Sequence, residues 1–437
     1  MSIMAGDDED EEGLYDFMDG EDFHGSTDDS NLDDYDLLMK VTDTSASQAR
    51  EGKDIQGIPW DKLNITREAY RRMRLQQYKN YEDLMPLSGE VQPVDNEGST
   101  LANNDEEYFD FFRNSRSVKP TILHFKLRNL VWATSKHDVY LISNNSVMHW
   151  SSSFQSLTRV INFSEHVDVD VAPSESHPGV STIAVKDRFL LAGGFHGQLI
   201  CKRLDEAGIS FCTRATQRDE NAITNAIEIF DNSSSSSGLC FVTCNNDCSV
   251  REYDLERFQL LNHFDFPWPV NHAMMSPNRK LLTVVGDDPN GLLIDARNGK
   301  TIASVSGHLD YSFTSAWHPE GMMFATGNQD KTCRVWDLRN LSASITILKG
   351  HIGAIRKICF SADGEFLVAA EPADFVHIYT VKGNYKQKQE IDFFGEITGV
   401  SLSPNDESMY VGIWDRTYAS LLQYNRKHAY KYLDSVM

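Results

Sequence analysis

The chain has 437 residues, of which 41% are hydrophobic and 11% aromatic, and it carries 41 Lys and Arg against 64 Asp and Glu. This length and apolar content exclude a wholly disordered chain and a disulfide-stapled mini-protein. A net charge of −23 disfavours direct binding to nucleic-acid phosphates. The sequence contains no run of 18 apolar residues, so it predicts no membrane-spanning helix. Seven cysteines without a C-x-x-C pair favour a reducing compartment, the nucleus or the cytoplasm.

Residues 1–60 are predicted to form a disordered acidic tail, because they are poor in apolar periodicity and too polar to bury a core. Residues 1–36 alone hold fifteen acids and no Lys or Arg, and the rest of the chain is only mildly acidic. We interpret the tail mainly as a solubilising segment. The alternative is that it binds histones or other basic proteins.

Residues 61–84 predict a short basic helix. Thr66 is a candidate N-cap, no Gly or Pro interrupts residues 66–81, and five bases outnumber the single acid Glu68. This helix could bind an acidic partner or the acidic tail. We favour docking of its tyrosines on the flank of the main domain. Residues 85–107, rich in Pro, Gly, Asn and Asp, predict a linker.

Residues 108–437 contain short β-rich runs separated by turns, and the clearest unit runs from Gly307-His308 to Trp336-Asp337. A Gly-His opener, and a turn Asp followed six and seven residues later by Trp-Asp, resemble a WD40 repeat. The resemblance implies a structural tetrad of hydrogen-bonded side chains formed by His308, Thr326, Asp330 and Trp336.

Six further units follow the same frame, with some positions degenerate. In the unit that Gly350-His351 opens, Ala373 replaces the turn Asp and Tyr379 replaces the Trp. The third strands are predicted to end near residues 142, 202, 253, 294, 336, 379 and 421. Four of the six intervals match the period of propeller blades, and the other two indicate insertions. We therefore predict an all-β fold, a seven-bladed WD40 β-propeller over residues 108–437. Residues 108–112 are the candidate closing strand, with residues 425–437 as the alternative.

The sequence shows no motif for catalysis. It has no nucleophile elbow, P-loop, dinucleotide-binding glycine pattern or H-E-x-x-H. Cys240, Cys244 and Cys248 are spaced by four residues, which on a strand, turn and strand does not gather them around a metal. We predict a protein that is not an enzyme and that uses no cofactor or metal.

The resemblance also implies a partner-binding wide face. It comprises residues just before each turn Asp, together with residues three and five positions after each Gly-His histidine. Exposed aromatic and arginine side chains on such a rim are typical of protein-binding hot spots. The predicted rim residues are Tyr311, Phe313, Gln329, Phe195, Asn246, Asn271, Asp287, Arg356, Thr398 and Trp414.

Trp336, Asp337 and Arg339 form a WDxR box. The box resembles the motif by which some WD40 proteins dock to the adaptor of cullin-RING ubiquitin ligases, with Arg339 as the contacting residue. The simpler interpretation, which we favour, is that Trp-Asp is the signature of the repeat itself.

Three further segments resemble a family of uncharacterised WD-repeat proteins of fungi and plants, namely residues 64–90 with their motif at 71–82, residues 113–150 and residues 286–291. The resemblance covers roughly residues 60–437 and implies no activity. The predicted function is a non-enzymatic scaffold or adaptor for other proteins, with no direct contact to nucleic acid or membrane. The alternatives are a receptor that binds a ubiquitin-ligase adaptor and a binder of basic proteins.

Overall fold

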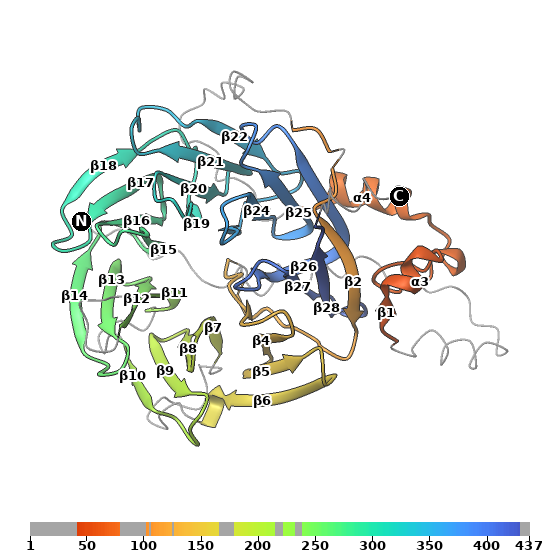
Figure 1. The fold of residues 1–437 in the computed structure, drawn as a ribbon, viewed down its shortest axis with the longest axis horizontal. Coiled ribbons are helices and arrows are strands. Elements are labelled where there is room, and N and C mark those ends of the chain that lie inside the picture. Colours follow the sequence, from red (N-terminus) through yellow and green to blue (C-terminus); the bar gives the residue numbers. More distant parts are fainter. Residues whose placement is uncertain are drawn as a thin grey trace, which may run out of the picture. The chain divides into compact units, whose positions relative to one another are not determined.

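Antiparallel strands arranged as a ring make up most of the computed structural model (Figure 1). The structure describes residues 42–78, 102–104, 106–124, 126–165, 179–214, 222–231 and 238–428. The chain divides into two units, residues 1–42 and 43–437, and the account below concerns the second.

Five sheets of four strands each form blades 1 to 5 of the ring. Blade 1 contains β3 (Val131–Ala133), β4 (Asp138–Ser143), β5 (Ser146–Ser151) and β6 (Ser156–Asn162), and a short 3-10 helix, η3 (Phe163–Glu165), follows it. Blade 2 contains β7 (Val180–Lys186), β8 (Phe189–Gly194), β9 (Gln198–Arg203) and β10 (Phe211–Arg214). Blade 3 contains β11 (Thr224–Asp231), β12 (Leu239–Asn245), β13 (Ser249–Asp254) and β14 (Leu260–Asp265). Blade 4 contains β15 (Val270–Met275), β16 (Leu281–Gly286), β17 (Asp288–Asp295) and β18 (Thr301–Val305). Blade 5 contains β19 (Ser312–Trp317), β20 (Met323–Asn328), β21 (Thr332–Asp337) and β22 (Thr346–Lys349).

Blades 6 and 7 share one long strand and therefore belong to one sheet. The strands of this sheet are β23 (Lys357–Phe360), β24 (Phe366–Ala370), β25 (Ala373–Thr380), β26 (Lys388–Leu402), β27 (Ser408–Trp414), β28 (Ser420–Arg426), β2 (Phe109–Ser115) and β1 (Thr44–Ser45). The first half of β26 pairs with β25 in blade 6, and its second half pairs with β27 in blade 7. The described residues thus contain seven blades of four strands, which confirms the predicted seven-bladed propeller.

An N-terminal strand closes the ring. Strand β2 pairs antiparallel with β28, so that Phe109 lies opposite Arg426 and Ser115 opposite Leu421. The predicted closing strand at residues 108–112 is therefore confirmed. Of the alternative closing segment, residues 425–426 end β28 itself, and residues 429–437 lie outside the described residues. Closure leaves β28 paired on both sides, with β27 and with β2.

The predicted repeat frame is wrong for blade 1. Residue 142 lies in β4, the second strand of that blade, whereas the other six positions lie in third strands. The third strand of blade 1 is β5, which carries Trp150. Strands β4 and β5 are joined only by Asn144 and Asn145, with Asn144 in the left-handed region. No Asp precedes the end of β5 by six residues, so the Asp spacing that marks the third strand in other blades is missing here. The sequence therefore did not distinguish β4 from β5 as the third strand of blade 1.

Neighbouring blades are tied together by polar side chains of their innermost strands. In each case a side chain donates to a backbone carbonyl of the next blade, which satisfies a buried acceptor in the middle of the ring. The donors and acceptors are Ser181 Oγ to Thr224 O (2.6 Å), Asn225 Nδ2 to Val270 O (2.8 Å) and Asn271 Nδ2 to Ser312 O (3.0 Å).

Residues 43–62 are structured, which corrects the predicted tail of residues 1–60. Strand β1 pairs with β2, and α3 (Ala46–Arg50) and η2 (Trp60–Lys62) follow it beside blade 7 (Figure 1). The Gln56 amide bonds both backbone groups of Phe394, as a neighbouring strand would. The segment is held by such polar contacts rather than by a core of its own, which explains why its composition predicted disorder. Residues 1–41 of the predicted tail lie outside the described residues.

The predicted basic helix exists as α4 (Arg67–Gln77), shorter than the predicted residues 61–84. Thr66 is its N-cap, and its side-chain oxygen accepts a hydrogen bond from the backbone nitrogen of Ala69 at 3.2 Å. Of the predicted linker at residues 85–107, only residues 102–104, 106 and 107 are described.

Helix α4 docks on the outside of blades 6 and 7 through a buried carboxylate. Asp374, fully buried on β25, accepts from Arg71 Nη1 at 2.6 Å and from Arg74 Nε and Nη2 at 2.6 and 2.9 Å. The Arg71 guanidinium also lies 4.2 Å from the ring centre of Phe394, against which Tyr70 packs. The helix therefore docks on the flank of the propeller, as predicted. Its arginines form most of the polar contacts, whereas the prediction assigned the docking to its tyrosines.

The substitution Asp374→Ala is expected to release α4. It leaves two largely buried guanidinium groups without their carboxylate, which costs about 3 kcal/mol or more in the free energy of unfolding. Urea denaturation measures this loss, and limited trypsin digestion reports cleavage after Arg71 and Arg74. The control is Asp392→Ala, which removes a carboxylate that is 38% exposed and pairs with Arg67 on the same helix. Wild-type resistance to trypsin in the Asp374→Ala variant would contradict the anchor.

Candidate functional site

The predicted tetrad is present in blade 5. His308 lies with Nδ1 2.9 Å from Asp330 Oδ2 and Nε2 2.9 Å from Thr326 Oγ1, and Trp336 Nε1 donates to the same Thr326 oxygen at 2.9 Å. Trp336 is fully buried. The four side chains join β20, β21 and the loop before β19, so their role is to hold the blade together.

Blade 6 replaces the tetrad with a different buried network. The Glu371 carboxylate accepts from His377 Nε2 at 2.8 Å and from the backbone nitrogens of His351 and the two residues after it. On the other side, Glu390 Oε2 lies 2.8 Å from His351 Nε2 and 3.3 Å from His377 Nδ1. Neither glutamate stands at a tetrad position, so the degenerate sequence gave no sign of this network.

His351, His377 and Glu390 are also the one group of described residues whose ligand atoms could surround a metal ion, since these atoms lie within 4.8 Å of one another. However, Lys388 Nζ lies 2.7 Å from the same Glu390 oxygen. Its ammonium supplies the positive charge that a metal would bring. The cluster therefore has its own positive charge, although His377 Nδ1, which lies 3.3 Å from Glu390 Oε2, is a buried atom without a hydrogen-bond partner.

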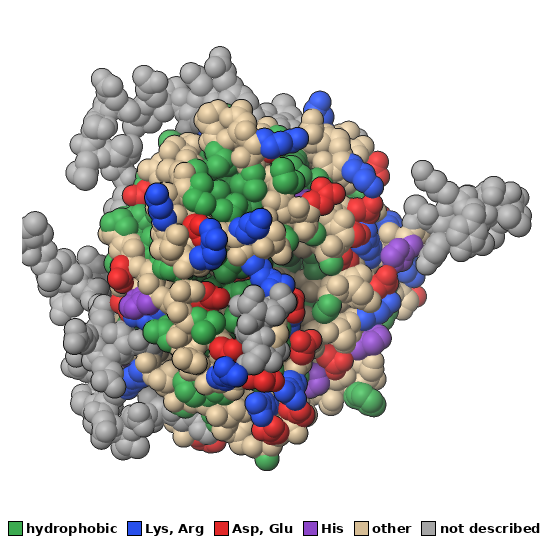
Figure 2. All heavy atoms as spheres, turned by 60° about the vertical axis from the view of Figure 1, so that its left-hand side comes forward, with side chains coloured by type: hydrophobic (Ala, Val, Ile, Leu, Met, Phe, Trp, Pro, Cys, Tyr) green, Lys and Arg blue, Asp and Glu red, His purple; other side chains and the backbone are tan. Residues whose placement is uncertain are grey.

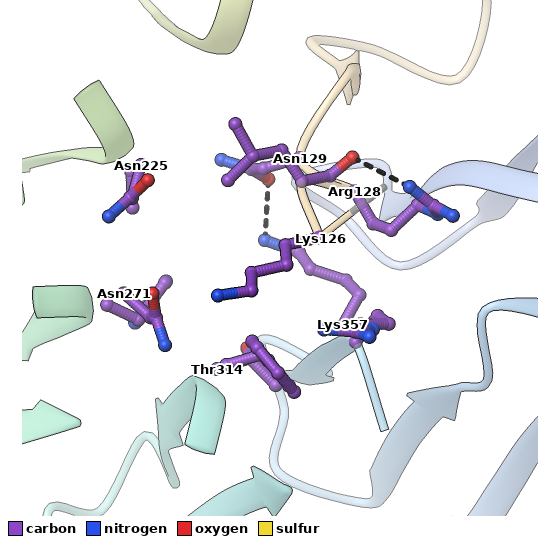
Figure 3. A pocket seen from close by; sticks show the side chains of 12 residues that line it. Lys126, Arg128, Asn129, Asn225, Asn271, Thr314 and Lys357 are labelled. Atoms are coloured by element: carbon purple, nitrogen blue, oxygen red, sulfur yellow. Dashed lines mark hydrogen bonds between the residues drawn. The ribbon is translucent and has the colours of Figure 1, made fainter. Parts of the chain in front are cut away.

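A small central cavity lies between the innermost strands of blades 3 to 6 and the segment that precedes β3 (Figure 3). Its volume of about 20 Å³ accommodates one or two water molecules. This is far below the roughly 300–1,000 Å³ of sites that enclose small-molecule substrates. The lining residues are Lys126, Leu127, Arg128, Asn129, Asn225, Ala226, Asn271, His272, Phe313, Thr314, Arg356 and Lys357.

The lining of the central cavity is cationic, although the protein as a whole is strongly acidic. It includes four basic side chains and no carboxylate. Lys126 extends toward the side on which Asn225 and Asn271 lie, and Lys357 donates to Asn129 Oδ1 at 2.7 Å (Figure 3). Carboxylates outside the lining partner two of the cations, because Lys126 Nζ lies 3.7 Å from Asp287 and Arg128 lies 3.0 Å from Glu396.

No carboxylate contacts Arg356, whereas Arg128, the other arginine of the lining, pairs with Glu396. Arg356 is 4% exposed, its Nη2 donates to Gln329 at 3.1 Å, and its guanidinium carbon lies 3.7 Å from the ring centre of Phe313. Its Nε and Nη1 atoms are buried without a hydrogen-bond partner. Burial and, second, the charge of Arg128 lower the pKa of Arg356 from 12.5 to about 9, so Arg356 remains a cation at neutral pH.

One cavity residue, His272, belongs to a group that resembles a catalytic triad. Its Nδ1 lies 3.1 Å from Ser315 Oγ and its Nε2 lies 3.2 Å from Glu228 Oε1. Ser315 is only 2% exposed, so a substrate cannot reach its hydroxyl group. The three residues come from β19, β15 and β11 and connect three successive blades.

The predicted rim residues divide into two groups. The half-exposed group consists of Phe195, Asn246, Asp287, Tyr311 and Trp414. The prediction of exposure is wrong for a buried group that consists of Asn271, Phe313, Gln329, Arg356 and Thr398. The buried residues bond to neighbouring blades or line the cavity, because the inner strands converge there and leave little of each side chain exposed.

Several cavity residues were not predicted from the sequence. Lys126, Arg128 and Asn129 precede the first inner strand and lie in no repeat unit, so the repeat frame gave them no position. Lys357 follows Arg356 directly, and this basic pair at the start of β23 is the signal that could have indicated a cationic centre.

The predicted ligase-docking residues differ in their exposure to solvent. Trp336 is fully buried and offers no surface to an adaptor, whereas the Arg339 side chain is 74% exposed. Asp337 holds Arg339 through its Nε at 2.9 Å and through its Nη2. Asp295 and Arg297 form the same pair in the corresponding turn of blade 4, where no Trp precedes the Asp. The pair is therefore a feature of the turn itself.

The surface combines charges of both signs. Figure 2 shows Lys and Arg side chains near the middle of one side of the molecule, with acidic and hydrophobic side chains between and around them. Among the described residues, the helices are too short and too polar to traverse a lipid bilayer.

The blade 6 network is expected to make stability depend on pH. Burial opposes the shifts, but hydrogen bonds and opposite charges lower the pKa of Glu371 and Glu390 and raise the pKa of His377. The two glutamates therefore stabilise the folded state fully at pH values above their ordinary pKa of 4.5. This contribution is lost as the pH falls through their lowered pKa values. His377 contributes fully below its ordinary pKa of 6.5 and loses its contribution as the pH rises through the raised value.

Urea denaturation of the wild type and His377→Gln at pH 6.0 and pH 8.5 tests this dependence. The stability difference between the two proteins should be larger at pH 6.0. The exposed His263→Gln substitution on β14 serves as the control. An equal difference at both pH values would show that His377 does not titrate with the network.

Arg356→Met is expected to raise the free energy of unfolding by about 1–3 kcal/mol. The substitution removes a buried charge and two nitrogens without acceptors, while the apolar chain can still pack on Phe313. The matched control is Arg251→Met, because Arg251 is equally buried but pairs with Asp247 at 2.6 Å and its loss should destabilise. Urea denaturation compares them, and equal destabilisation of both variants would contradict an unpaired Arg356.

Residues 299–337 and 342–374 match the family model of the WD domain, G-beta repeat. Pre-mRNA-processing factor 19 homolog 2 of Arabidopsis thaliana is 29% identical over 104 residues, which are 23% of this chain and 19% of that protein. The U3 small nucleolar RNA-associated protein 15 homolog of Xenopus tropicalis is 24% identical over 211 residues, with 38% of this chain and 40% of that protein covered. The chain thus spans less than half the length of either relative.

A chain in the crystal structure of a mitotic checkpoint complex is similar in fold, with a TM-score of 0.57 at 14% sequence identity. The similarity covers 81% of this chain and all of the other chain. Together with the tetrad of blade 5 and the ring of seven blades, these matches identify residues 299–337 and 342–374 as WD40 repeats and the fold as a seven-bladed β-propeller of the WD40 type.

Proposed function

We propose that the protein is a non-enzymatic scaffold that binds other proteins at the end of the ring where the central cavity lies. One observation carries the proposal. The cavity is too small for a substrate, yet its cationic and amide side chains lie beside half-exposed rim residues, among them Tyr311 and Asp287. Lys126 connects the two sets, since it lines the cavity, lies 3.7 Å from Asp287 and lies 5.9 Å from the ring centre of Tyr311.

The absence of accessible catalytic groups at this site supports a binding role. Of the triad-like group, the described lining contributes His272, whose partner Ser315 lies behind the lining and is only 2% exposed. The rim instead offers aromatic side chains and hydrogen-bonding groups around a fixed centre. Such a combination suits a protein surface that inserts one or a few side chains.

The proposal extends to compartment. The names of the relatives refer to pre-mRNA processing and to a small nucleolar RNA, and cysteines such as Cys201 and Cys333, which form no disulfide, suit a reducing environment. We therefore place the protein in the nucleus, the cytoplasm or both.

A second candidate function is docking to a ubiquitin-ligase adaptor. It is favoured by one observation, namely that Arg297 and Arg339 are both highly exposed, at 81% and 74%, in corresponding turns of two adjacent blades. A receptor would lose its adaptor on Arg339→Ala, and Arg297→Ala shows whether the second turn takes part.

Affinity purification of the full chain with mass spectrometry tests the scaffold. We expect stable co-purifying proteins that are lost, at least about tenfold, when Tyr311 and Trp414 are both changed to Ala, since truncation of a hot-spot Tyr or Trp costs about 2 kcal/mol or more. The matched control changes Phe154 and Ile302 to Ala, two exposed apolar residues on outer strands and turns. If wild type and both double variants retain the same proteins, the rim is not the binding surface.

A further inference from the structure

Arg356 has a net surplus of buried hydrogen-bond donors and positive charge. Its Nε and Nη1 carry three N–H groups without an acceptor, and the remaining nitrogen is held by the neutral amide of Gln329. A buried cation without a counter-charge is costly, so its presence calls for a compensating function. The fold has met the same requirement elsewhere, because the equally buried Arg251 has Asp247.

The surplus extends beyond one residue. Among the residues that line the central cavity, the buried side-chain atoms without a hydrogen-bond partner are Arg128 Nε and Arg356 Nε and Nη1, all of which are donors on cations. His124 lies close to the same charges. Burial and, second, the positive charges of Lys126, Arg128 and Arg356 lower the pKa of His124 to about 3. His124 is therefore neutral at pH 7 and adds no positive charge to the site.

The nearby carboxylates are already occupied. Glu396 accepts from Arg128 Nη2 at 3.0 Å and from the Tyr78 hydroxyl at 2.7 Å, and Asp287 accepts from Asn271 at 2.8 Å. Glu228 Oε1 lies 3.2 Å from His272 Nε2. None of these acids contacts Arg356. The cavity therefore combines four cations, unsatisfied donors and no internal anion.

We propose that the central cavity is an anion subsite, in which Arg356 receives a carboxylate side chain from an acidic segment of a partner protein. This inference rests on the proposed scaffold function and names the chemistry of the partner. A volume of about 20 Å³ suits a carboxylate, which has three heavy atoms, better than a phosphoryl group. The Phe313 ring centre lies 3.7 Å from the guanidinium carbon and supports this group on one side.

The subsite gives specificity through desolvation. An uncharged amide in the same place would leave Arg356 without a counter-charge, whereas a carboxylate satisfies donors and charge together. Asn225 and Asn271, which already donate to the next blades, fix the walls and do not compete for the anion.

The experiment uses the full chain and three small probes. These are N-acetyl-glutamate N-methylamide, its neutral glutamine counterpart and N-acetyl-phosphoserine N-methylamide. Side-chain Nε–H resonances of 15N-labelled arginine report on Arg356 directly, and the Arg356→Lys variant assigns its signal. We expect a saturable shift of that signal with the glutamate probe, and at least about tenfold weaker binding of the glutamine probe.

Calorimetric titration of the variants completes the test. Arg356→Met should weaken the binding of the glutamate probe at least about tenfold, while Arg297→Met, which removes an exposed arginine paired within its turn, should leave it unchanged. No saturable shift, equal binding of the glutamine probe, or wild-type affinity in Arg356→Met would overturn the subsite. Phosphoserine that binds tenfold more tightly than glutamate would overturn the carboxylate and assign a phosphoryl group instead.

The two proposals fail separately. If the glutamate probe does not bind but the co-purifying proteins depend on Tyr311 and Trp414, the scaffold stands and the anion subsite falls. If the probe binds and no partner depends on the rim, the subsite stands and the scaffold on this rim falls.

Discussion

The pairing of β2 with β28 is the contact on which the whole ring depends, because it joins the two ends of the propeller in one blade. Without it, blade 7 lacks a strand and β28 presents an open edge. The closing blade also provides the surface on which residues 43–78 lie. Strand β1 extends its sheet, and α4 packs where β25 and β26 pass from blade 6 to blade 7.

Two buried charges near this junction show opposite solutions to the cost of desolvation. Asp374 has positive φ on β25 and is surrounded by donors from Arg71, Arg74 and the backbone of Gly395. Arg356 has only a neutral partner. The first arrangement fixes an element from outside the ring, and the second leaves a place for a group from another molecule. Burial that is fully compensated contributes to architecture, whereas uncompensated burial is a mark of binding sites.

The sequence was sufficient for features whose residues are close along the chain or repeat with a period. The blade 5 tetrad spans fewer than thirty residues, and the interval between third strands fixed the number of blades. Apart from ring closure, which follows from the repeat count, features that depend on residues hundreds of positions apart were not accessible from the sequence. Neither the Arg71 contact with Asp374 nor the contact of Asn129 with Lys357 has a local signal. The burial of half of the predicted rim residues could not be predicted for the same reason, since their exposure depends on how closely the seven inner strands converge.

Ring closure has a further consequence during synthesis of the chain. Strand β2 leaves the ribosome early, but its partner β28 follows roughly 300 residues later, which at 5–20 residues per second means a delay of about 15–60 s. During that interval β2, with its aromatic residues Phe109 and Phe111, has no native partner strand at its β28 edge. An unpaired apolar strand is a site for chaperone binding and for aggregation, so yield in the cell depends on how long it stays protected.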